Sequence, residues 1–300
     1  MTTASTTPAL YRPTSLDDAI ERLATSDLDA VPIAGATWVM RSPARGEPFR
    51  GEYVSLARIE ELGRIDDDGT NLTIGAAVTH ARLAEALAGY PGLDVLRQAA
   101  AKSANPSVRR QATVGGNLCT TGFAAADLVP ALLSLSAVAI VRGPAGETRM
   151  PLGRFLATRG AALPATVLSH VSVPLAPVVS AHARLTMRRA GDYPVVIVSA
   201  TAALDGAGVV ESATVAVGSV EPVARLWPEM AAALVGRPLD ADAAVLAARE
   251  HAGSFQARES VEVDGWYRSQ VLPVVVGRAV RALERSGQAG REDSGEAGRA

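Results

Sequence analysis

The spacing of apolar and polar residues changes several times along the chain, and each change predicts an element. Between residues 16 and 26, apolar side chains recur every three or four positions behind Ser15, which predicts a capped helix. The apolar runs 31–34 and 53–56 predict short buried strands. Short helices and strands then continue to a last strand at 167–173, which Pro174 closes.

Beyond residue 177 the pattern becomes strands first and helices afterwards. The expected strands are 183–187, 195–204 and 209–217, and the expected helices are 228–234, 241–255 and 267–285. This order is typical of a small α+β domain. Residues 286–300 are polar and glycine-rich without a period, so a disordered tail is expected.

Composition places the chain among ordinary globular proteins. It has 300 residues, 48% apolar and 20% charged, with a net charge of −2, and its length favours two domains. There is no basic excess that would indicate nucleic acid, no secretory signal, and no apolar run long enough to span a membrane. A cytoplasmic protein without a nucleic-acid partner is therefore expected.

A single cysteine, Cys119, narrows the chemistry of the chain. It excludes an internal disulfide, and a cysteine-ligated iron–sulfur cluster takes about four thiolates. The four histidines are scattered without ligand spacing, so no metal site is predicted. Nothing pairs Cys119 with a histidine base, and no catalytic side chain is predicted.

The stretch 112–127, ATVGGNLCTTGFAAAD, is the strongest candidate for ligand binding. Its adjacent glycines allow close approach of a ligand to the backbone, and successive N–H groups in such a turn can bind an anion. Hydroxyl and amide side chains nearby can bond phosphate or ribityl oxygens. A tight turn between a strand and a helix is the competing interpretation. A weaker second candidate is Gly35-Ala-Thr-Trp38, which follows a strand.

Several familiar motifs are absent from the sequence. There is no G-x-G-x-x-G after a strand, no G-x-x-x-x-G-K-[ST] and no G-x-S-x-G. A Rossmann site, a P-loop and a nucleophile elbow are therefore not supported.

At this point the chain resembles the flavin-binding medium subunit of the molybdenum hydroxylases, the group that contains xanthine dehydrogenase and aerobic carbon monoxide dehydrogenase. The resemblance extends from about Pro8 to Leu283. Five pieces carry the resemblance, and they follow one another along the chain as they do in the family. They are PIAGAT at 32–37, LTIGAAVT at 72–79, ATVGGNL at 112–118, RRAGDY at 188–193 and VDGWYR at 263–268, of which ATVGGNL is the most specific.

The resemblance implies an α+β protein. Residues 1–177 would form a two-subdomain FAD-binding fold of the vanillyl-alcohol oxidase (PCMH) type, with subdomains of about 1–56 and 57–177. Residues 178–285 would form a small C-terminal domain of a three-stranded sheet plus helices, before the tail at 286–300.

It also implies that two loops hold the FAD pyrophosphate through backbone donors. Asp127 would lie near the ribityl or ring end of FAD, and Tyr193 near the isoalloxazine, with core packing as an alternative for Tyr193. The implied cofactor-binding residues are Ala34, Gly35, Ala36, Thr37, Trp38, Thr113, Val114, Gly115, Gly116, Asn117, Thr120, Asp127 and Tyr193.

The sequence departs from the family pattern at three places. Ala36 replaces the second glycine of the first loop, and the segment 104–110 before the second loop keeps little of its motif. Phe123 makes the stretch before Asp127 one residue longer.

Three functions remain open at this level. The first is a FAD-carrying subunit that passes electrons from [2Fe–2S] clusters of a small subunit to FAD and on to NAD, a quinone or another acceptor, with the substrate oxidised on a molybdopterin large subunit. The second is a stand-alone FAD-dependent oxidoreductase acting on a small molecule. The third is a scaffold that has lost its flavin.

Overall fold

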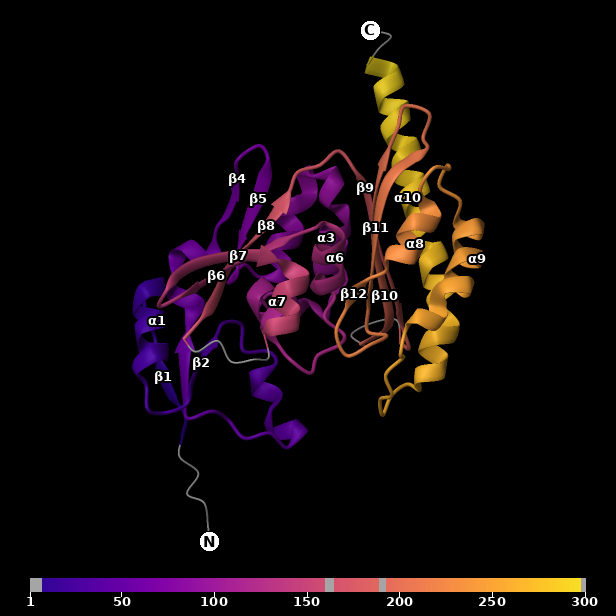
Figure 1. The fold of residues 1–300 in the computed structure, drawn as a ribbon. Coiled ribbons are helices and arrows are strands. Elements are labelled where there is room, and N and C mark those ends of the chain that lie inside the picture. Colours follow the sequence, from indigo (N-terminus) through magenta and orange to yellow (C-terminus); the bar gives the residue numbers. More distant parts are fainter. Residues whose placement is uncertain (1–6, 160–164, 189–192, 298–300) are drawn as a thin grey trace. The chain divides into compact units, whose positions relative to one another are not determined.

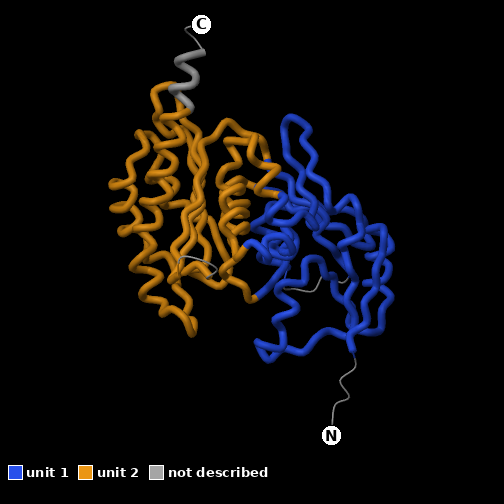
Figure 2. The backbone as a smooth tube through the Cα atoms, turned by 180° about the vertical axis from the view of Figure 1, so that it is seen from behind, with its two compact units in different colours: residues 1–82, 106–121, 137–173 blue, residues 83–105, 122–136, 174–300 orange. Residues whose placement is uncertain are grey.

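The chain forms two compact units, each built from separate stretches of sequence (Figure 2). The computed structural model describes residues 7–159, 165–188 and 193–297. Unit 1 contains residues 1–82, 106–121 and 137–173, and unit 2 contains residues 83–105, 122–136 and 174–300.

Unit 1 begins with a small parallel sheet in the order β1-β3-β2. Its strands are β1 (Ala9–Tyr11), β2 (Ala30–Ile33) and β3 (Glu52–Ser55). Helix α1 (Leu16–Thr25) starts at Ser15, whose side chain accepts a hydrogen bond from the Asp18 N–H, as expected for an N-cap. Its apolar face packs with Val54 of β3 in a shared core.

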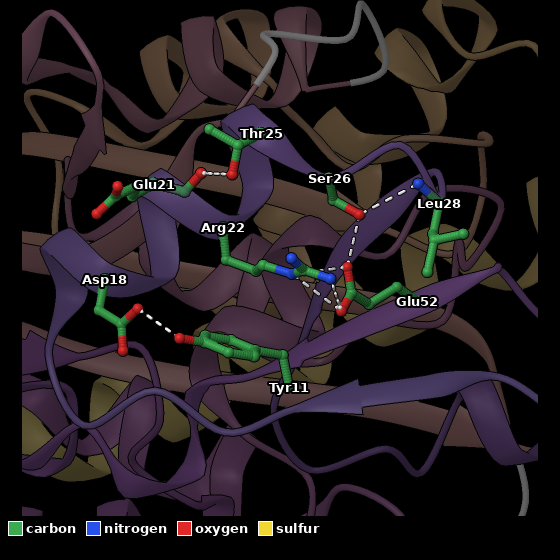
Figure 3. Close-up of polar contacts among 8 residues, drawn as sticks. All are labelled: Tyr11, Asp18, Glu21, Arg22, Thr25, Ser26, Leu28 and Glu52. Atoms are coloured by element: carbon green, nitrogen blue, oxygen red, sulfur yellow. Dashed lines mark hydrogen bonds and ion pairs between the residues drawn. The ribbon is translucent and has the colours of Figure 1, made fainter.

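A buried carboxylate, Glu52, ties α1 to this sheet (Figure 3). Arg22 donates to it through Nε at 3.0 Å and Nη2 at 2.8 Å, and the Ser26 hydroxyl donates at 2.6 Å. These bonds satisfy a charge that would otherwise be costly to bury. The Tyr11 hydroxyl bonds Asp18 in the same view, so α1 is fastened to both β1 and β3.

A second sheet of unit 1 has the order β4-β5-β8-β6-β7. Its strands are β4 (Ile65–Asp67), β5 (Asn71–Gly75), β6 (Val138–Gly143), β7 (Gly146–Pro151) and β8 (Val167–Pro174). The β4–β5 and β6–β7 pairs are antiparallel hairpins, and β8 lies antiparallel to β6. The unit also contains α4 (Pro106–Arg109), α5 (Val114–Cys119) and α7 (Leu152–Thr158).

Unit 2 is a sheet of order β12-β11-β10-β9 with helices on both faces, visible in Figure 1. Its strands are β9 (Val179–Thr186), β10 (Pro194–Leu204), β11 (Val210–Gly218) and β12 (Arg225–Leu226). Helices α3 (Asp94–Lys102) and α6 (Leu128–Ser134) pack on one face. Helices α8 (Pro228–Leu234), α9 (Ala241–His251) and α10 (Gly265–Ala297) lie on the other side.

The remaining helices are short or join larger elements. They are α2 (His80–Ala86) and the 3-10 turns Val39–Arg41, Pro43–Arg45, Leu56–Arg58, Glu60–Gly63, Leu87–Gly89, Pro91–Leu93 and Ala252–Ser254.

The three strands and three helices expected after residue 177 are all present, with β12 added as a two-residue edge strand. The expected disordered tail differs from the structure, because α10 continues to Ala297; residues 298–300 lie outside the described residues. Extending a helix costs far less than nucleating one, and Gly287 lies against Leu204 of β10.

The compact units also differ from a division at residue 177. Segments 83–105 and 122–136 group with the C-terminal sheet, since α3 and α6 pack on it. The domain limits inferred from the sequence remain a prediction.

Candidate functional site

The first candidate loop follows β2 in unit 1 and carries unused backbone donors. Within the described residues, the N–H groups of Gly35, Ala36 and Thr37 donate to no acceptor. The Met40 N–H closes the turn by donating to the Ala36 carbonyl at 2.9 Å. Successive backbone N–H groups that have no protein acceptor can together form an anion-binding nest.

Ala36 adopts the left-handed conformation, with φ of 59°. Glycine reaches this region without steric cost, whereas a Cβ disfavours it. The alanine therefore keeps a backbone shape suited to glycine and adds a methyl group to the loop.

The two candidate loops meet at Gly35. A Cβ built there would lie 1.8 Å from the Gln111 carbonyl oxygen and 3.3 Å from the Ala112 Cα. Only glycine allows this approach, so Gly35 brings the first loop against the residues that lead into the second.

The second loop is the first turn of α5 rather than an open turn. Thr113 is the N-cap, and its hydroxyl oxygen accepts from the Gly116 N–H at 3.1 Å. The Asn117 N–H donates to the Thr113 carbonyl at 2.9 Å. The N–H groups of Val114 and Gly115 donate to Val78 and Ala76, at 2.9 and 2.8 Å.

This arrangement corrects the expectation that the backbone donors of residues 114–117 face a phosphate. All four are used inside unit 1. The first N–H groups of a helix lack intrahelical acceptors, and here Thr113 and the sequence-distant segment 76–78 supply them.

The segment 72–79, the third resembling piece, packs directly against α5. A Cβ on Gly115 would lie 2.8 Å from the Ala76 Cβ. Thr79 pairs with Thr113 as an isolated bridge, and the His80 N–H donates to the Ala112 carbonyl at 2.9 Å. Three pieces distant in sequence therefore converge in unit 1.

Gly116 is the exposed position of this turn. A Cβ there would meet only the Thr113 hydroxyl oxygen, at 3.0 Å. Asn117 and Thr120 are half-buried beside it, and the Thr120 hydroxyl donates to the Gly116 carbonyl at 2.6 Å. Thr113, Val114 and Gly115 are buried and shape the turn from within.

Trp38 carries an unexpected cation. The Arg45 guanidinium lies 4.0 Å from the centre of the Trp38 ring, and its Nη1 donates to the Trp38 carbonyl at 3.1 Å. Such stacking is a favourable cation–π contact. Ala34 is half-buried between β2 and this turn.

Asp127 belongs to unit 2 and is buried there. Its Oδ1 lies 3.2 Å from Arg184 Nε and 3.4 Å from His182 Nε2, both on β9. The other ring nitrogen of His182, Nδ1, lies 2.9 Å from the Ser199 hydroxyl oxygen on β10. The carboxylate therefore lies within ion-pairing distance of β9, although its Oδ1 makes no hydrogen bond to the described residues, and its role toward FAD remains a prediction.

Tyr193 also belongs to unit 2 and is 42% exposed. Its ring meets Phe123 edge to face, with centroids 5.4 Å apart and an interplanar angle of 68°. Phe123 is the residue that lengthens the second loop, so the insertion supplies the partner of Tyr193. Residues 189–192 of the preceding motif lie outside the described residues.

Three residues that contact the predicted site residues were not expected from the sequence. Arg45, Ala76 and Arg184 are partners brought in by the fold, and no local pattern marks them. The arginine-rich loop 41–50 was the one available signal, since it supplies the cation on Trp38.

Two kinds of feature are absent from the described residues. No helix in that part of the chain is long and apolar enough to cross a bilayer. The same residues contain no group of three or more His, Cys, Asp or Glu placed to hold a metal ion.

Two family models match the chain. The model described as the FAD binding domain in molybdopterin dehydrogenase matches residues 4–176. The model of the CO dehydrogenase flavoprotein C-terminal domain matches residues 181–283.

Two relatives match almost the whole length of the chain, and a third matches about half of it. The chain is 28% identical to the 6-hydroxypseudooxynicotine dehydrogenase complex subunit alpha of Paenarthrobacter nicotinovorans, covering 91% of this chain and 93% of that one. It is also 28% identical to the carbon monoxide dehydrogenase medium chain of Afipia carboxidovorans, covering 92% and 96%. The xanthine dehydrogenase FAD-binding subunit of Escherichia coli O157:H7 is 32% identical over 48% of this chain and 49% of its own length.

Solved structures match the fold. A chain of the Cu,Mo-CO dehydrogenase superposes with a TM-score of 0.83 at 25% identity, covering 94% of this chain and all of the other. A chain of quinoline 2-oxidoreductase from Pseudomonas putida 86 gives a TM-score of 0.85 at 25% identity, covering 94% and 98%. The α+β fold with an FAD-binding part and a C-terminal domain is therefore confirmed. The chain belongs to the molybdenum hydroxylase family, as an FAD-binding medium subunit of the group that includes carbon monoxide dehydrogenase and xanthine dehydrogenase.

Proposed function

We propose that the chain holds FAD at the two loops of unit 1 and carries electrons from [2Fe–2S] clusters of a partner subunit to an external acceptor. A molybdopterin-containing large subunit would oxidise the substrate. The observation that supports this most is the convergence of residues 35–38, 76–79 and 111–117, where Gly35 and Gly115 allow close packing and Gly116 leaves one face of α5 open.

The residues present fit the pyrophosphate of FAD. The three unused N–H groups of Gly35, Ala36 and Thr37 supply donors without a lysine or arginine. Gly116 leaves the exposed face of α5 without a side chain, so a ligand can approach the main chain there. The side chains of Asn117 and Thr120 stand beside that face as polar groups.

The remaining predicted residues act on the site in other ways in this proposal. Thr113, Val114 and Gly115 shape the turn, while Ala34 and Trp38 frame the first loop. Tyr193 would contact the ring system, and Asp127 would act through Arg184 and His182.

Bound FAD accepts and releases electrons singly or in pairs, which suits a link between one-electron clusters and a two-electron acceptor. The protein's part is to bind, orient and partly cover the cofactor. With one cysteine in the chain, the clusters would be held by the small subunit. The external acceptor would be NAD, a quinone or another compound, and a cytoplasmic location remains a prediction.

Rapid-mixing kinetics of the chain in complex with its partners would test the electron route. Substrate added to a Gly116→Val complex should still reduce the iron–sulfur clusters, but acceptor reduction should fall at least tenfold, because the valine fills the open face of α5. A Cys119→Ser complex is the matched control, since Cys119 is exposed on the same short helix and should change neither step.

Unchanged acceptor reduction in a Gly116→Val complex lacking FAD would contradict the proposed route. A wild-type chain that oxidises a small molecule with bound FAD and without partners would favour the stand-alone oxidoreductase instead.

A further inference from the structure

A buried arginine, Arg268, lies in the first turns of α10 and is only 2% exposed. Its Nη1 donates to the carbonyls of Val195 and Ser219, at 2.7 and 3.1 Å. Its Nε donates to the Arg258 carbonyl at 3.1 Å, and Nη2 donates to the Ser260 hydroxyl at 2.9 Å. The guanidinium thus joins three separate backbone segments of unit 2.

This arginine has an unusual environment for a charge. Among the described residues it forms no ion pair with a carboxylate, and burial, together with the nearby Arg258, lowers the pKa of Arg268 to about 10. Burying a charge without a counter-ion is costly unless hydrogen bonds replace its water. Here the hydrogen bonds to three carbonyls and a hydroxyl replace that water.

The shared acceptor of both arginines is Ser219. Its carbonyl accepts from Arg268 Nη1 at 3.1 Å and from Arg258 Nε at 3.0 Å. Ser219 is fully buried and left-handed, with φ of 66°, directly after the end of β11. Such a conformation persists in a serine only when its surroundings fix it.

Ser219 in turn holds two other segments. Its N–H donates to the Ala124 carbonyl at 3.1 Å, and its hydroxyl donates to the Pro194 carbonyl at 2.5 Å. Ala124 follows Phe123, and Pro194 follows Tyr193. These are the two rings that meet edge to face.

We propose that Arg268 is a positioning residue that acts through Ser219 to set the Phe123–Tyr193 pair. Ser219 bonds the carbonyls of Ala124 and Pro194, which directly follow Phe123 and Tyr193 in the sequence. Arg268 and Arg258 in turn donate hydrogen bonds to the Ser219 carbonyl. The inference rests on the proposed function in one respect, that the Tyr193 side of this pair meets the flavin ring.

The alternative is that Arg268 merely stabilises unit 2. Arg225 provides a comparison within the same unit: it stacks 3.9 Å from the centre of the Phe255 ring and bonds the Glu221 carboxylate. Neither of those partners belongs to the Phe123–Tyr193 pair. A general loss of stability would follow from either substitution, whereas an effect on the aromatic pair should follow only from Arg268.

The test is a double-mutant cycle on the full-length chain in its complex, with FAD dissociation and the flavin reduction potential as readouts. Arg268→Lys and Tyr193→Ala should each weaken FAD binding by about threefold or more and shift the potential in the same direction. Because both would act on one contact, the double variant should match the stronger single variant rather than their product of about ninefold. Arg225→Lys should leave both readouts unchanged.

Ser219→Gly keeps the test decisive if Arg268→Lys fails to fold, because glycine tolerates a positive φ while losing the hydroxyl bond to Pro194. It should shift the flavin potential in the same direction. Additive effects in the double variant, or an unchanged potential in Ser219→Gly, would overturn the inference.

Acylation of Tyr193, followed by mass spectrometry, separates this inference from the proposed function. The rate should rise in Arg268→Lys whether or not FAD is present, because the ring loses its fixed position. Absence of FAD from the purified wild-type chain would refute the proposed function. An acylation rate in Arg268→Lys equal to that of the wild type would refute the role of Arg268.

Discussion

Ala36 occupies a left-handed backbone conformation, with φ of 59°, in the loop whose N–H groups are unused. Replacing it with glycine removes the Cβ that opposes this conformation. We expect Ala36→Gly to raise the free energy of unfolding by up to about 1 kcal/mol, because relief of strain exceeds the added freedom of the unfolded chain. Urea unfolding measures the change, and FAD should be retained.

Ala34→Gly is the matched control two residues earlier, where the alanine is not left-handed. There the glycine should lower the free energy of unfolding by about 0.5–1 kcal/mol. Equal effects of the two substitutions would mean that Ala36 is not strained.

Glu52 makes a second prediction at the scale of single residues. Hydrogen bonds from Arg22, followed in effect by the one from Ser26, hold the pKa of the Glu52 carboxyl below its ordinary value against the opposing effect of burial. A lowered folded-state pKa contributes stability above the unfolded pKa, and this contribution is lost as the pH falls through the folded value. Glu52→Gln should therefore lower the free energy of unfolding at pH 7 by about 1–3 kcal/mol.

The difference in the free energy of unfolding between Glu52→Gln and the wild type should narrow as the pH falls below about 4.3, the ordinary pKa of a glutamate. Glu60 is the control: it pairs with Arg64, but its side chain is 84% exposed. Glu60→Gln should change stability by less than about 0.5 kcal/mol. A pH-independent gap for Glu52→Gln would contradict the assigned cause.

At the scale of elements, α5 separates fold from binding. Gly115 faces Ala76 with no room for a Cβ, whereas a Cβ on Gly116 would meet only the Thr113 hydroxyl oxygen. Gly115→Ala should cost about 1–3 kcal/mol of stability through overpacking. Gly116→Ala should leave the melting temperature within a few degrees, about 2–4 °C.

Thermal unfolding of both variants without FAD measures this difference. A larger loss of stability in Gly116→Ala than in Gly115→Ala would mean that the exposed face of α5 has been assigned to the wrong glycine.

Elements with a strong local signal were predictable from the sequence. The helix at 228–234 matches α8, and the strand at 195–204 lies within β10. The turn at 113–119 became a capped helix because residues 76–78 supply acceptors from elsewhere in the chain. Its two glycines disfavour a helix locally, so only the long-range contacts explain it.

The candidate site was predictable to the same extent. The glycines at 35, 115 and 116 could be identified from the sequence, because positions where other atoms approach the backbone closely require glycine. The direction of the N–H groups could not, since that depends on which partner reaches each donor. The guanidinium of Arg268, bound to carbonyls alone, has no sequence signature either.

At the scale of the whole molecule, neither unit is one continuous stretch of chain, because segments of the two units alternate along the sequence. Segments 83–105 and 122–136 leave unit 1 to cover the sheet of unit 2. The second loop stands between them, at 106–121. A chain cut within either segment should therefore disturb both units, so the proposed site is best tested in the full-length protein.

The most direct test of the central claim is the ratio of FAD to protein after gentle purification of the full-length chain. We predict about one FAD per wild-type chain and per Cys119→Ser chain, and less than about a tenth of that for Gly116→Val with an unchanged far-ultraviolet circular dichroism spectrum. Full FAD content in Gly116→Val would contradict the assignment of the site to the loops of unit 1.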